Sequence, residues 1–276
     1  MQPAVTETGE IYEILAIRYG TNAGRKRGAN LILDRDPERL QPMDFYLWAL
    51  RSPHRTIVVD TGMHPHLAAK HGHSIDCPPP EALRRVGIEP AQVECVALTH
   101  LHYDHIGNLD AFPNATFLLQ QKEMEFVVGS HMEKFWFRRP YDAEEICNIV
   151  RLLHGGRLKI HAGDCQVAPG VSMHLVGGHT AGQEIVRVRT ARGNVVLASD
   201  AVHYYEELDR CVPFTVVYSV AEMLDAHDRI RVLADSEEHI VPSHDPEVIV
   251  RYPAATTELS GLAVRVDLPP VSAART

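Results

Sequence analysis

The chain has few of the features that mark several large protein classes. Its 276 residues include five cysteines, an odd number at scattered positions with no Cys-x-x-Cys pair, which argues against a disulfide framework or a zinc ribbon. The longest apolar run, Phe45 to Leu50, covers six residues, and a membrane-spanning helix needs about 20. Lys and Arg total 27 against 36 Asp and Glu, so the formal net charge of -9 argues against binding to nucleic acid or to an anionic membrane.

The beginning of the chain also has no basic segment followed by an apolar stretch. Glu7, Glu10 and Glu13 lie there instead, so we expect no secretory signal and a cytoplasmic location. No Gly/Ser-rich linker or fixed-period repeat divides the sequence, which favours a single domain over residues 1–276. Residues 268–276, with two consecutive prolines, have the composition of a flexible tail.

Short runs of β-branched and apolar residues predict two series of strands, with amphipathic segments between and after them. This order predicts two packed sheets flanked by helices. The first series of strands is expected at 11–19, 30–33, 45–50, 56–59, 93–98 and 115–119, and the second at 158–161, 172–176, 185–189, 195–198 and 239–241. Helices are expected at 79–85, 121–128 and 220–233.

Histidine is abundant, with 17 residues, and its pattern at residues 100–105 is the most informative part of the sequence. There the sequence His-Leu-His-Tyr-Asp-His offers four metal-type ligands in six positions, directly after an expected buried strand. Adjacent side chains diverge from a loop, so two ions about 3.5 Å apart can share it. We expect His100 and His102 to face one ion, and Asp104 and His105 to face the other.

Three further donors follow expected strands elsewhere in the chain. His179 comes after two glycines that allow a close backbone approach, and it is the best third ligand for the first ion. Asp200 is a carboxylate that can bridge two cations, with a helix N-cap as its alternative role. His244 would complete the ligand set of the second ion.

These residues, in this chain order, resemble those of the metallo-β-lactamase superfamily. The flanking motifs are similar to those of the N-acyl homoserine lactonase-like family, and the resemblance spans about residues 11–255. It implies an α/β fold, a four-layer αββα sandwich, with His100, His102 and His179 on one ion, Asp104, His105 and His244 on the other, and Asp200 bridging. The motifs that carry the narrower resemblance are Val59–Gly62, Leu98–Leu109, Ser199–Ala201 and Ser243–Glu247.

The resemblance also implies an activity and a cofactor. Two divalent metal ions are expected, with Zn(II) favoured and Fe, Mn or Co also compatible with the nitrogen and oxygen donors. A metal-bridging hydroxide would attack the ester carbonyl of a lactone, with N-acyl homoserine lactones, and hence quorum quenching, as the first substrate class to consider. Asp104 would carry the proton to the leaving alkoxide.

One departure from the family concerns the residue three positions after the bridging aspartate. Lactonases of this family commonly have a tyrosine there that donates to the substrate carbonyl, whereas this chain has His203, followed by Tyr204 and Tyr205. We expect one of the two tyrosines or His203 to take this role, with a purely structural role for all three as the alternative.

Two other segments invite an interpretation. The four histidines within residues 64–73 are expected in a mobile surface loop near the mouth of the site, with an extra metal site as the alternative. The aromatic-rich insert at about 125–150 is expected to form a lid or substrate pocket, a homodimer contact or plain core, and least of all a nucleic-acid surface. Asp60 is expected to hold a ligand histidine by a hydrogen bond.

Other functions remain open at this point. The chain could be a superfamily hydrolase of another ester, a thioester or a phosphoester, an iron-dependent redox enzyme, or a non-catalytic metal-binding module. A pocket lined by Arg and Lys would favour phosphoesters, whereas the aromatic insert favours an apolar acyl or aryl group. If the chain is a hydrolase, its expected binding partner is its substrate, a small-molecule lactone or ester.

Overall fold

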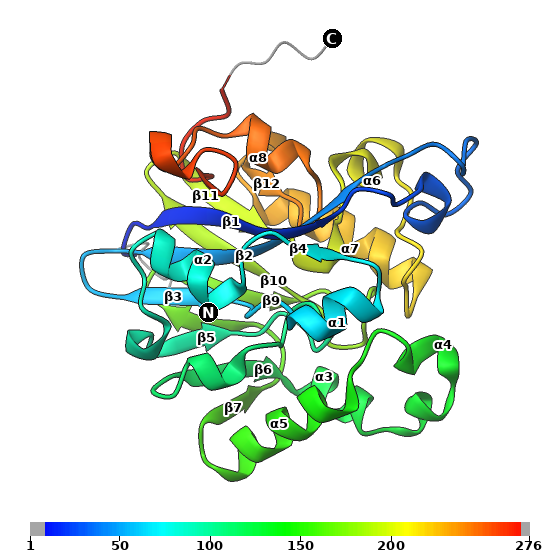
Figure 1. The fold of residues 1–276 in the computed structure, drawn as a ribbon, viewed down its shortest axis with the longest axis horizontal. Coiled ribbons are helices and arrows are strands. Elements are labelled where there is room, and N and C mark those ends of the chain that lie inside the picture. The colour runs from blue at the N-terminus through cyan, green and yellow to red at the C-terminus, as the bar shows by residue number, and fades with distance from the viewer. Residues whose placement is uncertain (1–8, 272–276) are drawn as a thin grey trace, which may run out of the picture.

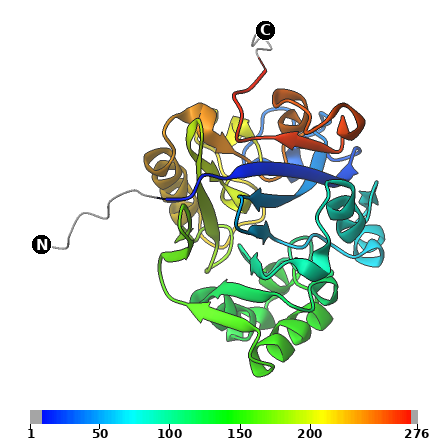
Figure 2. The same cartoon turned by 90° about the vertical axis from the view of Figure 1, so that its left-hand side faces the viewer.

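The computed structural model describes residues 9–271, which form two β-sheets packed face to face between layers of helices (Figures 1 and 2). The eight-stranded sheet has the order β13-β1-β2-β3-β5-β6-β7, with β4 paired to β1. Its strands are β1 (Glu13–Asn22), β2 (Met43–Arg51), β3 (Thr56–Val59), β4 (Ser74–Ile75), β5 (Cys95–Ala97), β6 (Thr116–Gln120), β7 (Leu158–His161) and β13 (Ala263–Arg265).

The second sheet has five strands in the order β12-β11-β10-β9-β8. They are β8 (Cys165–Ala168), β9 (Val171–Leu175), β10 (Glu184–Thr190), β11 (Gly193–Leu197) and β12 (Ile240–Val241). The helices are α1 (Pro65–Lys70), α2 (Pro79–Arg85), α3 (Gln121–Val127), α4 (Phe135–Arg138), α5 (Ala143–His154), α6 (Tyr205–Arg210), α7 (Val220–Leu233) and α8 (Glu247–Arg251).

Three apolar clusters hold these layers together. Trp48 and Val59 of the first sheet pack with Val186 and Leu197 of the second, so the inner faces of both sheets share one cluster. A second cluster joins the outer face of the first sheet to helices such as α2 and α5, and a third joins the outer face of the second sheet to α6 and α7. The expected four-layer αββα sandwich is therefore confirmed.

Parallel pairing brings several strand ends to one edge of the sandwich. β3, β5, β6 and β7 are parallel neighbours in the first sheet, and β11 and β12 are parallel in the second. The carboxyl ends of parallel strands lie at the same edge, which is where ligand sites collect in such sheets. The loops after these strands carry most of the expected metal ligands.

Most of the expected elements are present, but the strand at 30–33 is wrong. That segment follows a 3-10 helix at Arg27–Ala29 and turns at Leu33, whose φ of 58° is incompatible with a strand. Leu31 is buried and forms an isolated backbone bridge with Phe214, whereas Leu33 is 90% exposed. The histidine-rich segment 64–73, expected as a loop, contains the short helix α1.

The sequence patterns did not reveal α5, β8 or β13. The last strand expected from the sequence ends at residue 241, whereas the structure has further elements up to Arg265. Beyond β13, the backbone nitrogen of Val271 donates to Arg251 O at 2.9 Å, so the first part of the expected tail lies along the surface. Residues 272–276 of that tail lie outside the described residues. No helix in the described part of the chain is both long and apolar enough to cross a membrane.

Candidate metal centre

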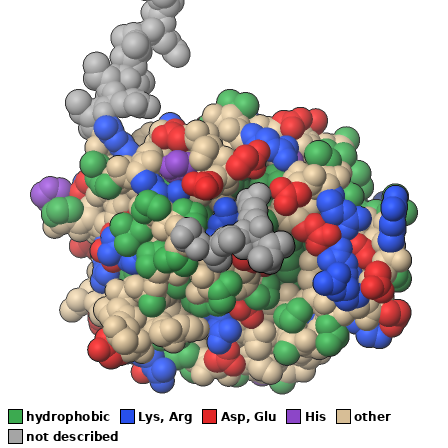
Figure 3. Space-filling model, turned by 90° about the horizontal axis from the view of Figure 1, so that it is seen from above, with side chains coloured by type: hydrophobic (Ala, Val, Ile, Leu, Met, Phe, Trp, Pro, Cys, Tyr) green, Lys and Arg blue, Asp and Glu red, His purple; other side chains and the backbone are tan. Residues whose placement is uncertain are grey.

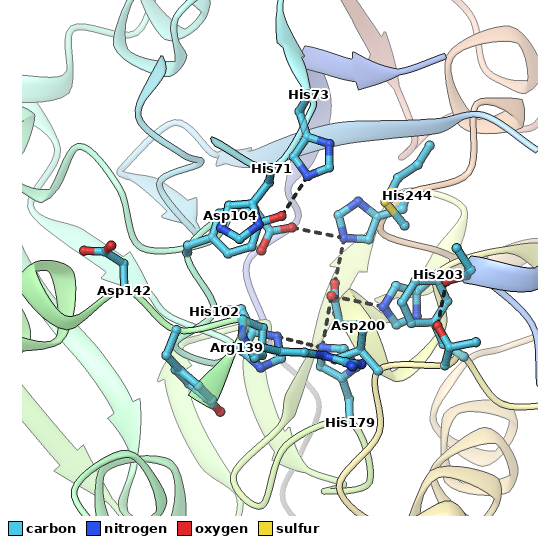
Figure 4. Close-up of a pocket in the computed structure, with 18 of the residues that line it drawn as sticks. His71, His73, His102, Asp104, Arg139, Asp142, His179, Asp200, His203 and His244 are labelled. Atoms are coloured by element: carbon cyan, nitrogen blue, oxygen red, sulfur yellow. Dashed lines mark hydrogen bonds and ion pairs between the residues drawn. The ribbon is translucent and has the colours of Figure 1, made fainter. Parts of the chain in front are cut away.

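Asp200 lies at the middle of a cluster of five ligand-type histidines and a second aspartate. Figure 4 shows His102, Asp104, His179 and His244 of this cluster around Asp200. Its Oδ2 lies 3.3 Å from His179 Nε2 and 3.8 Å from His100 Nε2. Its Oδ1 lies 3.2 Å from His105 Nε2 and 3.1 Å from His244 Nε2. The two oxygens of one carboxylate thus face two different groups of histidines, which is the arrangement expected of a bridging ligand.

The ligand atoms form two groups, and within each group they lie within 4.8 Å of one another. All seven residues predicted from the sequence are present in them, and all are buried. The first group is His100, His102, His179 and Asp200, and the second is Asp104, His105, Asp200 and His244.

The electrostatics of the cluster fit a cation in each group. The Nε2 atoms of His100 and His105 are buried without a hydrogen-bond partner among the described residues, which is costly unless another group uses their lone pairs. Burial lowers the pKa of His179 to about 3 and lowers that of His100 and His102 as well. These three imidazoles of the first group are therefore neutral at pH 7, the form that binds a metal. In the second group the carboxylates of Asp200 and Asp104 outweigh burial and raise the pKa of His105 and His244, so positive charge is favoured there.

Each ligand is carried by the loop after a strand. The segment 100–105 follows β5, His179 follows β9, Asp200 follows β11, and His244 follows β12. Close packing decides the path of the His179 loop: Gly178 has a φ of +86°, and a Cβ there would lie 2.5 Å from Met223 Cα. The expectation that the two glycines permit a close backbone approach is confirmed.

Asp60 contacts His105 of the second group on the side of the ring away from Asp200, as the sequence predicted. Its Oδ2 lies 2.8 Å from His105 Nδ1, and its two oxygens also accept from the Thr99 backbone nitrogen and hydroxyl, both at 2.8 Å. The bond to Nδ1 fixes the ring orientation and leaves Nε2 of His105 directed at Asp200. His244 is fixed in the same way by its Nδ1, 2.9 Å from Asp44 O.

Glu123 links the two loops that carry the first group, and the sequence gave no signal for it. This fully buried carboxylate accepts from Leu101 N at 3.1 Å, from Thr180 Oγ1 at 2.6 Å and from Gly182 N at 3.0 Å. It lies on α3 in the polar sequence Gln-Lys-Glu-Met-Glu, where nothing distinguishes it from a surface glutamate. Its donors come from segments about 20 and 60 residues away, so only the tertiary structure reveals its role.

The expectation for Tyr204 and Tyr205 is not supported, because neither lines the cavity over the metal centre. The Tyr204 hydroxyl accepts from Asn30 Nδ2 at 3.0 Å and lies 3.2 Å from Pro42 O, in the loop between β1 and β2. Tyr205 packs against the core between the sheets, with Arg251 4.4 Å from its ring centroid. A helix begins at Tyr205 and turns both side chains away from the site.

His203 is the one of these three candidates that lines the cavity. Its Nε2 lies 3.1 Å from Asp200 Oδ2, and its ring stacks on Phe214 with 3.6 Å between the centroids. The backbone nitrogen of His203 donates to the buried Glu207 at 3.0 Å. His203 therefore holds a defined position beside the Asp200 carboxylate.

A cavity of about 940 Å³ opens over the cluster (Figure 4). His71 and His73 of the histidine-rich segment line it, and His73 Nε2 lies 2.7 Å from the Tyr103 hydroxyl. Within the described residues these histidines join no metal-type group, so the alternative of an extra metal site has no support. The expected role at the mouth of the site fits their position.

The aromatic insert forms another wall of this cavity. Phe135 and Trp136 line it while remaining 69% and 50% exposed, and the Trp136 indole nitrogen donates to Val217 O at 3.3 Å. Phe126, Phe137 and Tyr218 pack edge to face behind them. Of the four roles considered for the insert, a pocket wall describes this arrangement best.

Comparison with known proteins identifies relatives of the same architecture. Residues 46–244 match the family model described as the metallo-beta-lactamase superfamily. The N-acyl homoserine lactonase AiiA of Bacillus thuringiensis subsp. kurstaki is 32% identical over 133 residues, which are 48% of each chain. The lactonase AiiB of Agrobacterium fabrum (strain C58 / ATCC 33970) is 25% identical over 189 residues, 59% of this chain and 63% of the relative. The matches thus span about half to two thirds of these relatives.

Solved structures confirm the fold over a longer stretch. The crystal structure of a quorum-quenching N-acyl homoserine lactone lactonase superposes with a TM-score of 0.72 at 24% identity, covering 88% of this chain and 95% of the other. AidC, a dizinc quorum-quenching lactonase, gives a TM-score of 0.65 at 16% identity, covering 87% and 89% of the two chains. At such identities the likeness establishes the shared fold.

Proposed function

This chain belongs to the metallo-beta-lactamase superfamily, and we propose that it is a dinuclear metal-dependent hydrolase that opens the ring of a lactone. The observation that carries the proposal is the Asp200 carboxylate, whose two oxygens face two separate groups of buried histidines. The lactonase relatives support the substrate class, with N-acyl homoserine lactones as the first members to test.

Two divalent cations held by these groups would polarise an ester carbonyl and lower the pKa of water toward about 7. The protein's own residues supply the rest of the chemistry. Asp104 lines the cavity and has Oδ2 at 3.7 Å from both His105 Nε2 and His244 Nε2. Its other oxygen is left to carry a proton to the alkoxide that leaves when the ring opens.

The cavity also suits the rest of a lactone substrate. Its volume of about 940 Å³ lies at the upper end of the range for small-molecule sites. Phe135, Trp136 and Val216 give it an apolar wall, next to the metal centre, that can cover an acyl or aryl group. Hydrolysis then takes place in a partly enclosed site where electrostatic interactions are stronger than in water.

Zinc is the proposed metal. The two groups consist of imidazole nitrogens and carboxylate oxygens without a thiolate, a donor set that suits Zn(II) and also accepts Fe, Mn or Co. The protein purified from its native host and analysed by inductively coupled plasma mass spectrometry should contain about two zinc ions per chain. Iron in place of zinc would overturn the proposed metal. Iron-containing protein that absorbs visible light and turns over only with oxygen or a thiol would point to the redox alternative.

The cytoplasm is the proposed compartment. Cys77, Cys95, Cys147, Cys165 and Cys211 are all free thiols, as suits a reducing environment. Fractionation of the native host, with the protein followed by immunoblotting, tests this. The homodimer stays a prediction, which light scattering coupled to gel filtration checks directly.

The central experiment measures hydrolysis of short- and long-chain acyl homoserine lactones and of simple γ- and δ-lactones by the zinc-loaded protein, with proton release as the signal. A kcat/KM above about 10⁴ M⁻¹s⁻¹ on any of these lactones, within the usual range for enzymes, supports the proposal. Rates near those of the Asp104→Asn variant across the whole panel, from protein with a full metal complement, would overturn it.

A further inference from the structure

The cavity over the metal centre has a cationic wall, which the net charge of the chain does not suggest and which is also the lining expected for the phosphoester alternative. Arg25, Lys70, Arg138 and Arg139 all line it. Outside the metal centre, Asp142 is the single acidic side chain among the described residues of the lining. The chain as a whole carries a formal charge of -9, and on the face seen in Figure 3 acidic and basic side chains are interspersed.

Arg139 is one of two half-buried cations in this wall, the other being Arg25. Its guanidinium carbon lies 4.0 Å from the centroid of the Trp136 ring, so one face of the guanidinium is covered by the indole. No carboxylate forms an ion pair with Arg139 in the part of the chain that the structure describes, and burial lowers its pKa. Stacking leaves the N–H edge of such a group free to bind a planar anion.

Arg25 approaches the same cavity from the loop between β1 and β2. Its guanidinium donates to Asn30 Oδ1 and to Ala29 O, neither of which is charged, and lies 5.4 Å from the centroid of Phe214. The pKa of His73, which lines the cavity, is lowered to about 4, mainly by burial and in part by the charge of Arg25. Arg25 is therefore within electrostatic reach of the cavity lining. Burial is the main cause of the lowered pKa of Arg139, and the charge of Arg25 lowers it further. The two guanidiniums therefore lie within electrostatic reach of each other.

The loop that carries Arg25 is held in place by other contacts. Arg27, two residues on, forms ion pairs with Asp34 at 2.7 Å and with Glu206 of α6 at 2.5 Å. Asn30 donates both to the Tyr204 hydroxyl at 3.0 Å and to Gln41 O at 3.1 Å. Arg25 is therefore presented by an anchored loop, which reduces the entropy lost when it binds a ligand.

From these contacts we propose that the cavity selects lactones that carry a carboxylate, bound by Arg139 and Arg25 while the ring lies over the metal centre. The inference rests on the proposed lactonase function and adds a substrate class to it. A neutral acyl chain would leave two partly desolvated guanidiniums without an anion, whereas a carboxylate gives each of them a charge-assisted hydrogen bond. Phe135 and Trp136 would cover the apolar part of the same molecule.

The test compares matched pairs of lactones on the zinc-loaded enzyme. One pair is 5-oxotetrahydrofuran-2-carboxylate and its primary carboxamide, the other phthalide-5-carboxylate and its carboxamide, with N-hexanoyl homoserine lactone as the neutral reference. We expect kcat/KM to favour the acid over the amide by about tenfold or more in at least one pair. In Arg139→Gln and Arg25→Gln the preference should fall toward unity, mainly through KM, and rising ionic strength should weaken it in the wild type.

Arg35→Gln is the matched control, because Arg35 is an exposed arginine of the same loop that does not line this cavity. It should keep the preference of the wild type. Hydrolysis of N-hexanoyl homoserine lactone without a preference for either acid would overturn the inference and leave the proposed function intact. A preference that survives both cavity substitutions, or faster turnover of 4-nitrophenyl phosphate than of any lactone, would also overturn it.

A binding measurement separates this inference from the lactonase proposal. 2-Hydroxyglutarate, the ring-opened form of the first acid, is titrated calorimetrically into wild-type and variant protein. Binding that weakens about tenfold in Arg139→Gln and is unchanged in Arg35→Gln supports the carboxylate site even if no lactone is turned over. Equal affinity in all the proteins overturns it.

Discussion

Nε2 of His203 lies 3.1 Å from Oδ2 of Asp200, the carboxylate oxygen that faces His100 and His179. The His203 ring is held there by stacking on Phe214. This contact places His203 where its ring can orient the Asp200 carboxylate.

We predict that His203→Ala lowers kcat by about 10- to 100-fold while the protein keeps its two metal ions. The reason is that Asp200 loses a neighbour that fixes its orientation, whereas the ligand set itself stays complete. Steady-state kinetics and metal analysis of the same preparation check this, with His203→Gln expected to recover part of the activity. Loss of metal from His203→Ala would instead make His203 part of the binding site.

Tyr204→Phe and Tyr205→Phe should keep kcat and KM within about twofold of the wild type, since neither side chain lines the cavity. Tyr204→Phe should lower the free energy of unfolding by about 1–3 kcal/mol, because Asn30 loses its buried acceptor. Steady-state kinetics and urea denaturation of both variants test these two expectations. A large drop in kcat for either one would restore the tyrosine role expected from the sequence.

Removal of the metal ions should destabilise the protein strongly. The two groups bring seven buried polar residues together, so any ion bound there stabilises the folded state by mass action. At 1,000 times the dissociation constant this amounts to about 4 kcal/mol per ion. A chelator should therefore lower Tm by roughly 10 °C or more and abolish turnover. Added Zn(II) should restore both, and an unchanged Tm after verified metal loss would contradict this.

Asp60→Asn should weaken the second metal group selectively. The Asp60 carboxylate accepts from Thr99 and lies 2.8 Å from His105 Nδ1, and an amide cannot satisfy both. We expect the affinity for one of the two ions to fall by about 10- to 100-fold, as measured by competition with a chromophoric chelator. Asp110→Asn, at an exposed position, is the control. Equal weakening of both ions would argue for a general loss of structure.

The buried His227 of α7 should make stability depend on pH. Burial lowers its pKa from 6.5 to about 4, so the unfolded chain binds more protons than the folded one between these values. The stability contributed by the neutral ring is complete above about pH 6.5 and is lost as the pH falls toward 4, by about 3 kcal/mol at most. Urea denaturation between pH 7.5 and 4.5 should show that the free energy of unfolding falls less in His227→Leu than in the wild type. His154→Gln, at an exposed position, is the control and should lose as much as the wild type.

The sequence by itself predicted the candidate metal ligands, which the fold brings together, and most of the elements of the fold. The ligands could be recognised because each follows a short apolar strand, and a strand end fixes where the next few side chains go. Alternating and helical periodicity placed β3, β7, α2 and α7 within their observed bounds, since one face of each is buried in the core. The contact between the Asp60 carboxylate and a histidine of the metal loop was also expected from the sequence.

Only the tertiary structure decided which side chains face the cavity. Tyr204 and His203 are neighbours in the chain, yet the start of α6 turns one toward a distant loop and the other toward Asp200. Glu123, Arg25 and Arg139 are ordinary charged residues in the sequence, and their roles depend on partners brought close by chain folding. A local pattern specifies local structure, whereas a cavity is lined by segments that meet only when the sheets and loops pack together.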